Sequence, residues 1–355
     1  MIDSYGWSPA LRHEFLPFAA HGFSPGRVIV QQRGAWRLAT DVGELTAELS
    51  GRFVRDAEAG GHPVAGDWVA ADLRPDEGCA TIRSLVPRRT AFVRRAAGGE
   101  TAQVVAANVD VAFLVASLNA DLNLRRLERY LALAYESGAE PVVVLTKADL
   151  CDDVATAIAE VEGVALAAPV LAVSSLSGDG LARVSDHLAP GRTAVLLGSS
   201  GAGKSTLVNA LAGSELMPTQ AIREDDARGR HTTTHRELVL LPSGGLVLDT
   251  PGMRELGLWD AEAGLAAAFT DVADLAADCR FADCRHEGEP GCAVQAALDE
   301  GRLAPDRLAS FGKLQRELAH LHRQEDPRSR QAQKKMWVVR NKALKVHYKL
   351  KDVRR

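Results

Sequence analysis

One stretch of the chain has the residue types and spacing of a loop that wraps phosphate groups. A predicted strand precedes it and a predicted helix follows it. The stretch fits the pattern G-x4-G-K-S without a mismatch and consists of Gly198, Ser199, Ser200, Gly201, Ala202, Gly203, Lys204 and Ser205, with Thr206 next. Consecutive backbone N–H groups of such a loop surround phosphates, and its glycines permit the close approach. We expect Lys204 to reach the β- and γ-phosphates of a nucleotide and the Ser205 hydroxyl to ligate Mg²⁺. The alternative is a Gly/Ser-rich connection between a strand and a helix.

Three further polar segments come directly after predicted apolar strands. They are Thr146-Lys147-Ala148-Asp149, Ser174-Ser175-Leu176 and Asp249-Thr250-Pro251-Gly252. The Asp149 carboxylate can accept from the N1–H and 2-amino groups of guanine, which adenine does not offer. Lys147 would lie along the base, and Ser174 and Ser175 would contact it from the other side. Asp249 would hold Mg²⁺ through a water molecule, and the Gly252 N–H would sense the γ-phosphate. Ligands bind at the carboxyl ends of strands in open α/β sheets, so these segments together predict a guanine-nucleotide site, although each short motif alone arises often by chance.

A third group of residues has the types that bind metal ions. Only two cysteines, Cys79 and Cys151, lie outside this group, which spans 14 positions and consists of Cys279, Cys284, His286 and Cys292. Three thiolates and one imidazole form a closed tetrahedral site for a structural Zn²⁺ and leave no position open for catalysis. The alternative is a set of reduced cysteines beside a surface histidine. We expect a structural metal here and packing roles for the two lone cysteines.

The segment from Arg27 to about Arg95 is rich in short strands separated by turn signals. The predicted strands are Val28–Gln32, Trp36–Thr40, Leu45–Leu49, Trp68–Leu73, Thr81–Val86 and Thr90–Arg94. Five or six short strands in so little chain favour a small β-barrel of the oligonucleotide-binding (OB) type. Trp36, Phe53 and Trp68 either fill this barrel or stack on bases, and filling is the favoured interpretation.

Strands and helices alternate from Ala102 onward. The predicted strands are Val109–Ser117, Pro141–Thr146, Val170–Val173 and Thr193–Leu197, and the predicted helices are Leu124–Ser137, Asp152–Glu162, Leu181–Leu188 and Lys204–Ala212. This alternation predicts an α/β domain whose parallel sheet is covered on both faces. A hairpin of Glu237–Leu241 and Leu246–Asp249 is expected at the edge of that sheet. The chain after Leu258 reads as helical around the Cys/His group.

The nucleotide motifs resemble those of Ras-like GTPases in a permuted order, because the base-reading segments precede the phosphate loop. With a barrel before them and a Cys/His group after them, the chain resembles the ribosome small subunit-dependent GTPase A family over about residues 25–320. The resemblance implies a circularly permuted P-loop GTPase domain that binds GTP or GDP with Mg²⁺. It implies one Zn²⁺ on the three cysteines and His286. It also implies that Gly229–Thr234 is switch I, with Thr233 as a Mg²⁺ ligand and catalytic residue beside His231 and Lys204.

The chain departs from the Ras-like pattern at two positions. Thr146 begins the base-reading motif where Asn is usual. Because that Asn mainly ties loops together, Thr146 would weaken guanine binding, whereas Asp149 would keep the discrimination. No Gln follows Gly252, and Met253 cannot orient water. We therefore expect slow intrinsic hydrolysis, with His231 as the local candidate for orienting water. The alternative is that His231 only shapes switch I or contacts RNA.

Charge is distributed unevenly over the 355 residues. Residues 321–355 include 12 basic and 3 acidic residues, a net charge of +9, whereas the rest of the chain carries −13. A basic tail on an acidic body is typical of an arm that binds a polyanion, or of a solvated helical extension. The absence of a major-groove motif favours structured RNA over sequence-specific DNA. No apolar run has the length of a membrane helix, so we expect neither a membrane span nor a secretory signal, and the five cysteines favour a reducing cytoplasm.

These observations predict five segments along the chain: an N-terminal extension (1–26), the OB-type barrel (27–97), the permuted GTPase domain (98–258), a small helical zinc-binding domain (259–320) and a basic tail (321–355). We expect a cytoplasmic monomer that hydrolyses GTP to GDP and phosphate when docked. The partner that the resemblance implies is the small ribosomal subunit with its rRNA, during late maturation. Two alternatives stay open: a GTPase of large-subunit assembly, and a nucleotide-gated RNA-binding regulator with negligible turnover.

Overall fold

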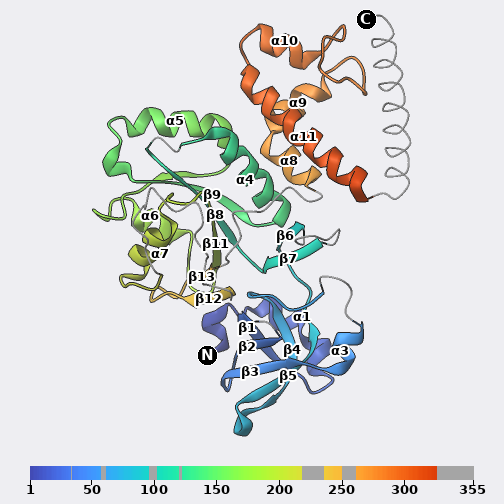
Figure 1. Cartoon of the computed structure of the whole chain (residues 1–355), viewed down its shortest axis with the longest axis vertical. Coiled ribbons are helices and arrows are strands. Elements are labelled where there is room, and N and C mark those ends of the chain that lie inside the picture. Colours follow the sequence, from blue (N-terminus) through green and yellow to red (C-terminus); the bar gives the residue numbers. More distant parts are fainter. Residues whose placement is uncertain are drawn as a thin grey trace, which may run out of the picture.

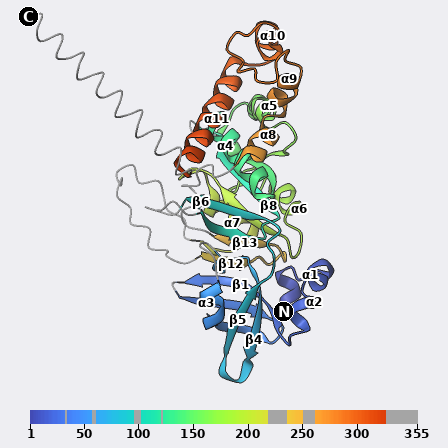
Figure 2. The same ribbon diagram turned by 90° about the vertical axis from the view of Figure 1, so that its right-hand side faces the viewer.

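The structure is a computed structural model that describes residues 1–32, 34–56, 61–95, 102–119, 122–217, 236–249 and 261–325. Figure 1 shows three regions stacked along the long axis of the molecule: a barrel around β1–β5 (within residues 24–85), an α/β region around β8–β13 (within residues 111–249), and a group of helices α8–α11 (within residues 262–325). Figure 2, turned by 90°, shows the same order, so the barrel and the α8–α11 helices lie at opposite ends of the α/β region.

The α/β region contains the parallel sheet that the alternating pattern predicts. Its strands run in the order β10-β9-β8-β11-β13-β12, and only β12 is antiparallel to its neighbour β13. The strands are β8 (Val111–Ser117), β9 (Glu140–Thr146), β10 (Val170–Ala172), β11 (Thr193–Leu197), β12 (Arg236–Leu240) and β13 (Leu246–Asp249). Every residue of β8 is buried, as expected for a central strand with both faces covered.

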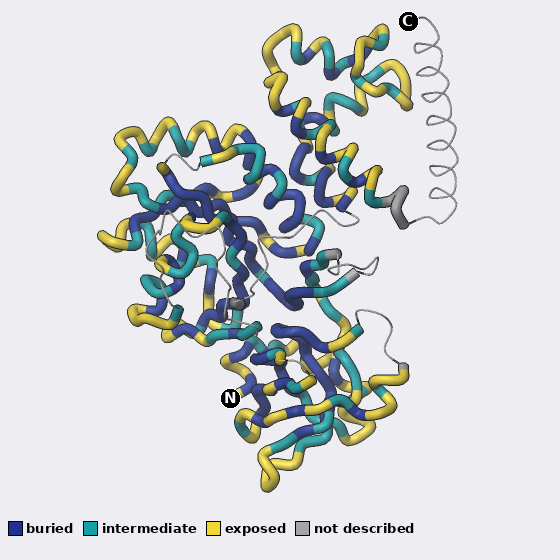
Figure 3. Tube along the Cα trace, in the orientation of Figure 1, coloured by how far each residue is buried: buried dark blue, intermediate teal, exposed yellow. Residues whose placement is uncertain are grey.

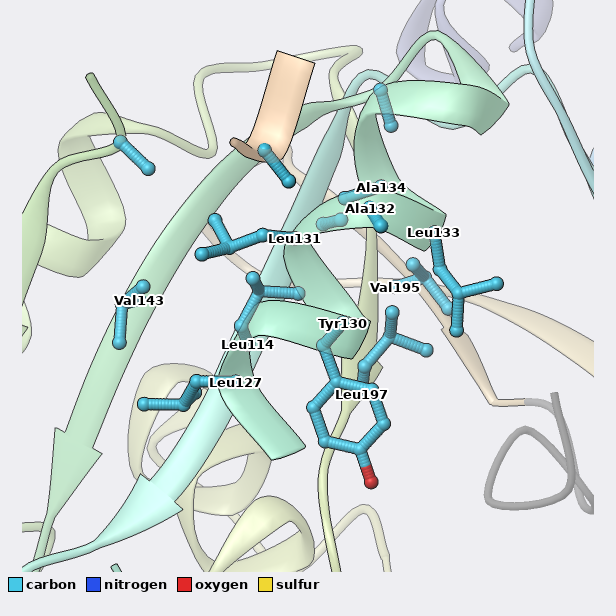
Figure 4. Close-up of a cluster of buried hydrophobic side chains, with 14 of the residues drawn as sticks. Leu114, Leu127, Tyr130, Leu131, Ala132, Leu133, Ala134, Val143, Val195 and Leu197 are labelled. Atoms are coloured by element: carbon cyan, nitrogen blue, oxygen red, sulfur yellow. The ribbon is translucent and has the colours of Figure 1, made fainter. Parts of the chain in front are cut away.

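Helices cover both faces of this sheet, which confirms the predicted architecture. They are α4 (Leu124–Ser137), α5 (Val154–Ala165), α6 (Leu181–Asp186) and α7 (Lys204–Ala212). Alternate residues of β8 enter two separate cores: Leu114 packs with Leu131 of α4, whereas Phe113 packs with Leu207 of α7. Figure 4 shows the first of these cores, with side chains of α4 lying over β8, β9 and β11. The tube in Figure 3 is accordingly buried along these strands and exposed along the outer side of α5.

The barrel is formed by five strands whose ends meet. These are β1 (Ser24–Gln32), β2 (Ala35–Thr40), β3 (Gly43–Leu49), β4 (Trp68–Arg74) and β5 (Cys79–Leu85), with the short helices α3 (Gly51–Asp56) and η2 (Pro75–Glu77) between strands. The strand order is β1-β2-β3-β5-β4, and an additional β1–β4 pairing closes the sheet. Val28, Leu38 and Ile82 fill its core. Trp36 is buried in this core and Phe53 packs against it, as expected, whereas Trp68 is buried in a different cluster, with Ile2 and Trp7.

An N-terminal layer that the sequence pattern did not predict packs on the barrel. It consists of η1 (Ile2–Tyr5), α1 (Pro9–Glu14) and α2 (Leu16–Ala19). Ile2, Trp7 and Leu11 form an apolar cluster with Trp68 of β4. The Trp7 and Trp68 rings lie 5.0 Å apart between centroids.

Two sequence-based expectations about strands are wrong. The β12–β13 hairpin is not an edge, because β1 of the barrel pairs with β12 and the two regions share one sheet of 11 strands. The predicted strand Thr90–Arg94 is not part of the barrel: β6 (Ala91–Arg95) pairs with β7 (Ala102–Ala107) in a separate two-stranded sheet. The apolar side chain of Phe92 explains this placement, since it packs in the core under α4.

The C-terminal helices rest on the α/β region. They are α8 (Glu262–Ala268), α9 (Thr270–Ala277), α10 (Ala293–Asp299) and α11 (Pro305–Glu325). Helix α8 lies directly against α4, because Gly264 has no side chain: an added Cβ would lie 2.2 Å from the carbonyl oxygen of Ala132. The Gly264 N–H also donates to the Glu136 carboxylate of α4 at 2.8 Å. Among the described residues, no helix has the length and hydropathy needed to span a membrane.

Candidate guanine-nucleotide and metal sites

The phosphate loop connects β11 to the first turn of α7, as predicted. Gly201 and Gly203 have φ angles of 78° and 88°, which glycine adopts without strain. Gly198 is buried against β8, where a Cβ would lie 2.4 Å from the Val115 carbonyl oxygen. The Lys204 ammonium donates to the carbonyl oxygens of Gly198 and Ser199, at 2.8 and 2.6 Å. The loop is therefore folded around the lysine that we expect to bind phosphates.

Of the remaining residues of this loop, Ala202 is buried, Ser199 and Ser205 are half-buried, and Ser200 and Thr206 are exposed. Helix α7 begins at Lys204, and no side chain caps its N-terminus. A helix N-terminus behind a glycine-rich loop is a favourable environment for an anion. The loop thus has the backbone and the cation that a phosphate group needs.

The base-reading segment lies at the carboxyl end of β9. Thr146 is buried, and its hydroxyl donates to the Ala202 carbonyl oxygen of the phosphate loop at 2.7 Å. Lys147 has a left-handed backbone, with φ of 60°, and the exposed Asp149 lies on the short helix η3 (Ala148–Leu150). Thr146 therefore links the base-reading strand to the phosphate loop, which is the role that Asn has in the usual motif.

The third predicted segment follows β10 at the same edge. Ser174 is buried, and its hydroxyl accepts from the Ser177 N–H at 3.2 Å, whereas Ser175 is half-buried and Leu176 is 84% exposed. The Ala148 N–H donates to the Val173 carbonyl oxygen at 3.1 Å, which joins this loop to the base-reading segment. The structure thus brings together three loops that come from separate parts of the sequence.

The predicted metal-side carboxylate belongs to the last residue of β13. Because β13 is parallel to β11, Asp249 ends its strand at the edge where the phosphate loop begins. Its neighbour across the hairpin is Glu237 of β12. The other residues predicted for Mg²⁺ or hydrolysis, which are His231, Thr233 and Gly252, lie outside the described residues.

The four predicted zinc ligands converge. Their ligand atoms all lie within 4.8 Å of one another, with 3.9 Å between the sulfurs of Cys279 and Cys292 and 3.4 Å from His286 Nδ1 to the Cys292 sulfur. Zinc–sulfur bonds of about 2.3 Å in a tetrahedron separate two sulfurs by about 3.8 Å. The donor set and its spacing therefore fit Zn²⁺.

The loop that carries these ligands is ordered by its own hydrogen bonds. The Glu289 carboxylate accepts from the N–H groups of Arg285 and Glu287 at 2.9 and 2.8 Å. The Gln295 side chain of α10 donates to the His286 carbonyl oxygen. Desolvation, with further contributions from Cys292 and Cys279, raises the pKa of the Cys284 thiol to about 11. A bound cation would offset the cost of forming a thiolate there.

Two buried arginines that sequence reasoning missed join the three regions. Arg27 of β1 donates to the Tyr5 carbonyl oxygen at 2.5 Å and to the Thr193 hydroxyl of β11 at 2.9 Å, and burial lowers its pKa to about 10. Arg307 of α11 donates to the Glu128 carboxylate of α4 and to Asp271, both at 3.0 Å. No sequence signal identifies these pairs, because each partner is distant along the chain.

The fold and the convergence of these loops define a class of protein: a circularly permuted P-loop GTPase with an OB-type barrel before it and a Cys₃His module after it. The profile of the RsgA GTPase family matches residues 85–259, and that of the 50S ribosome-binding GTPases matches residues 193–342. The chain belongs to the RsgA GTPase family, because similarity to its members extends over nearly the whole length.

Two relatives and two solved structures illustrate this similarity. The small ribosomal subunit biogenesis GTPase RsgA of Opitutus terrae is 50% identical over 95% of each chain. That of Streptomyces coelicolor is 48% identical over 93% of this chain and 90% of its own. The crystal structure of YjeQ from Thermotoga maritima covers 84% of this chain and 99% of its own, with 26% identity and a TM-score of 0.63. The structure of YloQ, described as a circularly permuted GTPase, has the same identity and TM-score and covers 96% of its own chain.

Proposed function

We propose that this protein binds GTP or GDP with Mg²⁺ at the edge where β9, β10, β11 and β13 end. The observation that supports this most strongly is the link between the base-reading strand and the phosphate loop, in which the Thr146 hydroxyl donates to the Ala202 carbonyl oxygen at 2.7 Å. The charge and the hydrogen-bonding groups of each side chain suggest its role in binding the nucleotide. Lys204 binds the β- and γ-phosphates, Asp149 reads the guanine edge, and Ser205 and Asp249 hold the magnesium side of the nucleotide.

Hydrolysis is proposed to be slow in the free protein and fast in a complex. No Gln occupies the position after Gly252, so the chain lacks the usual group that orients the attacking water. His231 is the proposed substitute, with Thr233 as a further magnesium ligand. A docked partner would then fix these residues and raise the rate.

The proposed partner is the small ribosomal subunit with its rRNA. The full-length relatives named above are small-subunit biogenesis GTPases, and the basic segment 321–355 suits a polyanion. We further propose a monomer that acts in the cytoplasm without membrane or sequence-specific DNA binding. The Zn²⁺ held by the Cys₃His module has a structural role, because four protein ligands leave no open position.

A role in large-subunit assembly is the second candidate. The observation that favours it is the match of residues 193–342 to the 50S ribosome-binding GTPase profile. That match begins at β11, whereas the small-subunit relatives align over more than nine-tenths of the chain, including the barrel. We therefore favour the small subunit. The other alternative, a nucleotide-gated RNA-binding regulator with negligible turnover, differs from both candidates. Its affinity for RNA would depend on the bound nucleotide but not on GTP hydrolysis.

Nucleotide specificity provides the test of the site. The Asp149→Asn variant replaces a carboxylate that accepts from guanine by an amide that donates to the 2-oxo group of xanthine. We expect GDP affinity to fall at least about 100-fold and xanthosine diphosphate to bind better than GDP. Fluorescence titration with labelled nucleotides measures both, and Asp152→Asn, an exposed Asp outside the motif, is the matched control. Unchanged GDP affinity in Asp149→Asn would overturn the assignment of the base-reading residue.

A further inference from the structure

The Asn209 side chain of α7 holds the chain that follows this helix. Its amide group donates to the Met217 carbonyl oxygen at 2.7 Å, and its side-chain oxygen accepts from the N–H groups of Met217 and Leu216 at 2.7 and 3.0 Å. One side chain therefore pairs with both backbone groups of Met217, as a neighbouring strand would. An amide suits this task because it offers a donor and an acceptor on separate atoms, whereas a carboxylate only accepts.

These contacts fix the direction in which the chain leaves α7. The helix ends at Ala212, and Gly213 follows in the left-handed region with a φ of 65°. Because Met217 pairs with Asn209, the chain has turned back by about one helical turn and runs toward the start of α7. The Met217 side chain packs against the apolar core between α7 and the sheet. Hydrogen bonds and one apolar contact thus anchor residues 214–217 to α7.

The anchor lies on the face of α7 that carries a predicted magnesium ligand. Ser205 precedes Asn209 by four positions, and side chains at this spacing are neighbours on one face of a helix. A rise of about 1.5 Å per residue separates them by about 6 Å along the helix axis. Residues 218–235 follow the anchor along the chain and contain the predicted switch I, Gly229–Thr234. The chain therefore starts toward switch I beside the turn of α7 that carries Ser205.

The other end of this stretch is fixed as well. Arg236 begins β12 and pairs with Gln31 of β1, and its guanidinium donates to the Gln31 side chain at 3.1 Å. The entropy of closing a loop changes only slowly with its length. Release of residues 214–217 would therefore act mainly through the lost hydrogen bonds, and only slightly through the longer loop.

We propose that Asn209 is a positioning residue for GTP binding, which holds residues 214–217 on α7 and so favours the arrangement in which switch I meets the magnesium and γ-phosphate side of the nucleotide. GDP lacks the γ-phosphate that orders switch segments, so its affinity depends mainly on the phosphate loop and the base-reading segment. The anchor should therefore contribute more to GTP affinity than to GDP affinity. The proposal rests on the proposed function, in which Gly229–Thr234 acts as switch I.

The test compares the affinities of the full-length protein for labelled GDP and for a labelled non-hydrolysable GTP analogue. Both are measured by fluorescence titration in the presence of Mg²⁺. The variants are Asn209→Ala, which removes all three hydrogen bonds, and Met217→Ala, which removes the apolar contact but keeps the backbone groups. Ala210→Gly is the matched control, because it lowers the helix propensity of the same turn without removing a contact of the anchor.

We expect Asn209→Ala to bind the GTP analogue about fivefold to tenfold more weakly than the wild type, and to bind GDP within about twofold of it. Met217→Ala should shift the two affinities in the same direction by a smaller factor. Ala210→Gly should leave their ratio unchanged. If Asn209→Ala binds the GTP analogue as tightly as the wild type or more tightly, or if it loses affinity for both nucleotides equally, the proposal is wrong.

Hydrolysis stimulated by small subunits provides a second readout. An anchor that acts alike in the bound state and in the transition state changes KM and not kcat, so Asn209→Ala should raise the KM for GTP about fivefold at the wild-type kcat. A fall in kcat at unchanged KM would contradict this role. The proposed function is tested separately: if the wild type binds GDP no better than Lys204→Ala does, the nucleotide site itself is wrong, whatever the Asn209 variant shows.

Discussion

At the residue scale, the contacts of Thr146 support a base-reading role for a motif that lacks its usual Asn. Its hydroxyl donates to the buried Ala202 carbonyl oxygen, and its oxygen lies 3.3 Å from where a Cβ on Gly203 would be. The contact is close enough that the side chain and the phosphate loop hold each other in place. Thr146 and Gly203 therefore form one unit that positions the loop.

We predict that Thr146→Val weakens nucleotide binding. Valine keeps the shape of threonine but leaves the buried Ala202 carbonyl without its donor, which costs about 1–3 kcal/mol. GDP affinity should fall about tenfold in a fluorescence titration. Thr146→Ser, which keeps the hydroxyl, should bind GDP nearly as the wild type does. Equal affinities of the Val and Ser variants would show that the hydrogen bond does not position the loop.

The motifs also show which residues a sequence can and cannot predict. The residues of the phosphate loop and of the zinc site were predictable because their types and spacing are dictated by local backbone geometry and metal chemistry. The pair of Arg307 and Glu128 was not predictable, since its members are 179 positions apart and either alone reads as an ordinary surface charge. Only the packing of α11 on α4 makes both of them buried.

At the element scale, the Cys₃His module depends on two helix ends. Cys279 follows α9, and Cys292 is the N-cap of α10, where its sulfur accepts from the Gln295 N–H at 3.4 Å. The chain between these helices has few buried apolar residues. Phe281, for example, is 43% exposed. Metal coordination is therefore the main force that we expect to hold this loop.

We predict that Cys284→Ser abolishes zinc binding. Serine is a poor zinc ligand, and three remaining ligands leave the site open to chelators. Elemental analysis should find one zinc per wild-type chain and close to none in the variant. Cys151→Ser, a lone cysteine outside the module, is the control and should retain zinc. A variant that keeps stoichiometric zinc would contradict the ligand assignment.

The junction between α11 and α4 is the second element-scale feature. The Arg307 guanidinium is nearly buried, contacts Glu128 and Asp271, and lies 4.1 Å from the centre of the Phe269 ring. Arg307→Met should destabilise the protein by about 1.5–3 kcal/mol, because the buried Glu128 carboxylate loses one of its two arginine partners and keeps only Arg125 and the Ser310 hydroxyl. Arg302→Met, which removes an exposed pair with Glu300, should cost less than about 1 kcal/mol. Urea denaturation followed by circular dichroism measures both, and equal stabilities would refute this role of the pair.

At the scale of the whole molecule, the α/β region is held at both ends. Its strand β12 continues into the barrel through β1, and its helix α4 carries α8 and α11. The stretches that precede β12 and α8, residues 218–235 and 250–260, contain the predicted switch I and Gly252. Each stretch leads along the chain into an element that contacts a neighbouring region, so we propose that nucleotide-dependent changes there would reach both ends of the molecule.

The class of fold was predictable at this scale, whereas the connections between regions were not. Continuous apolar runs such as Val111–Ser117, separated by helical segments, predict buried parallel strands. The short strands separated by turn signals before them predict a barrel. The addition of β1 to β12 uses backbone hydrogen bonds and contacts between side chains far apart in the sequence, such as Arg236 and Gln31, and neither leaves a pattern in the local sequence. The N-terminal layer was missed for a related reason, because Ile2, Trp7 and Leu11 follow neither helical nor strand periodicity.

We expect this chain to hydrolyse GTP in response to the small ribosomal subunit. The most direct measurement is the rate of phosphate release with purified small subunits, with large subunits and with neither, using Lys204→Ala as the inactive control. We predict slow release by the free protein, strong stimulation by small subunits alone, and no release by the variant. Stimulation by large subunits instead, or by neither, would contradict the account.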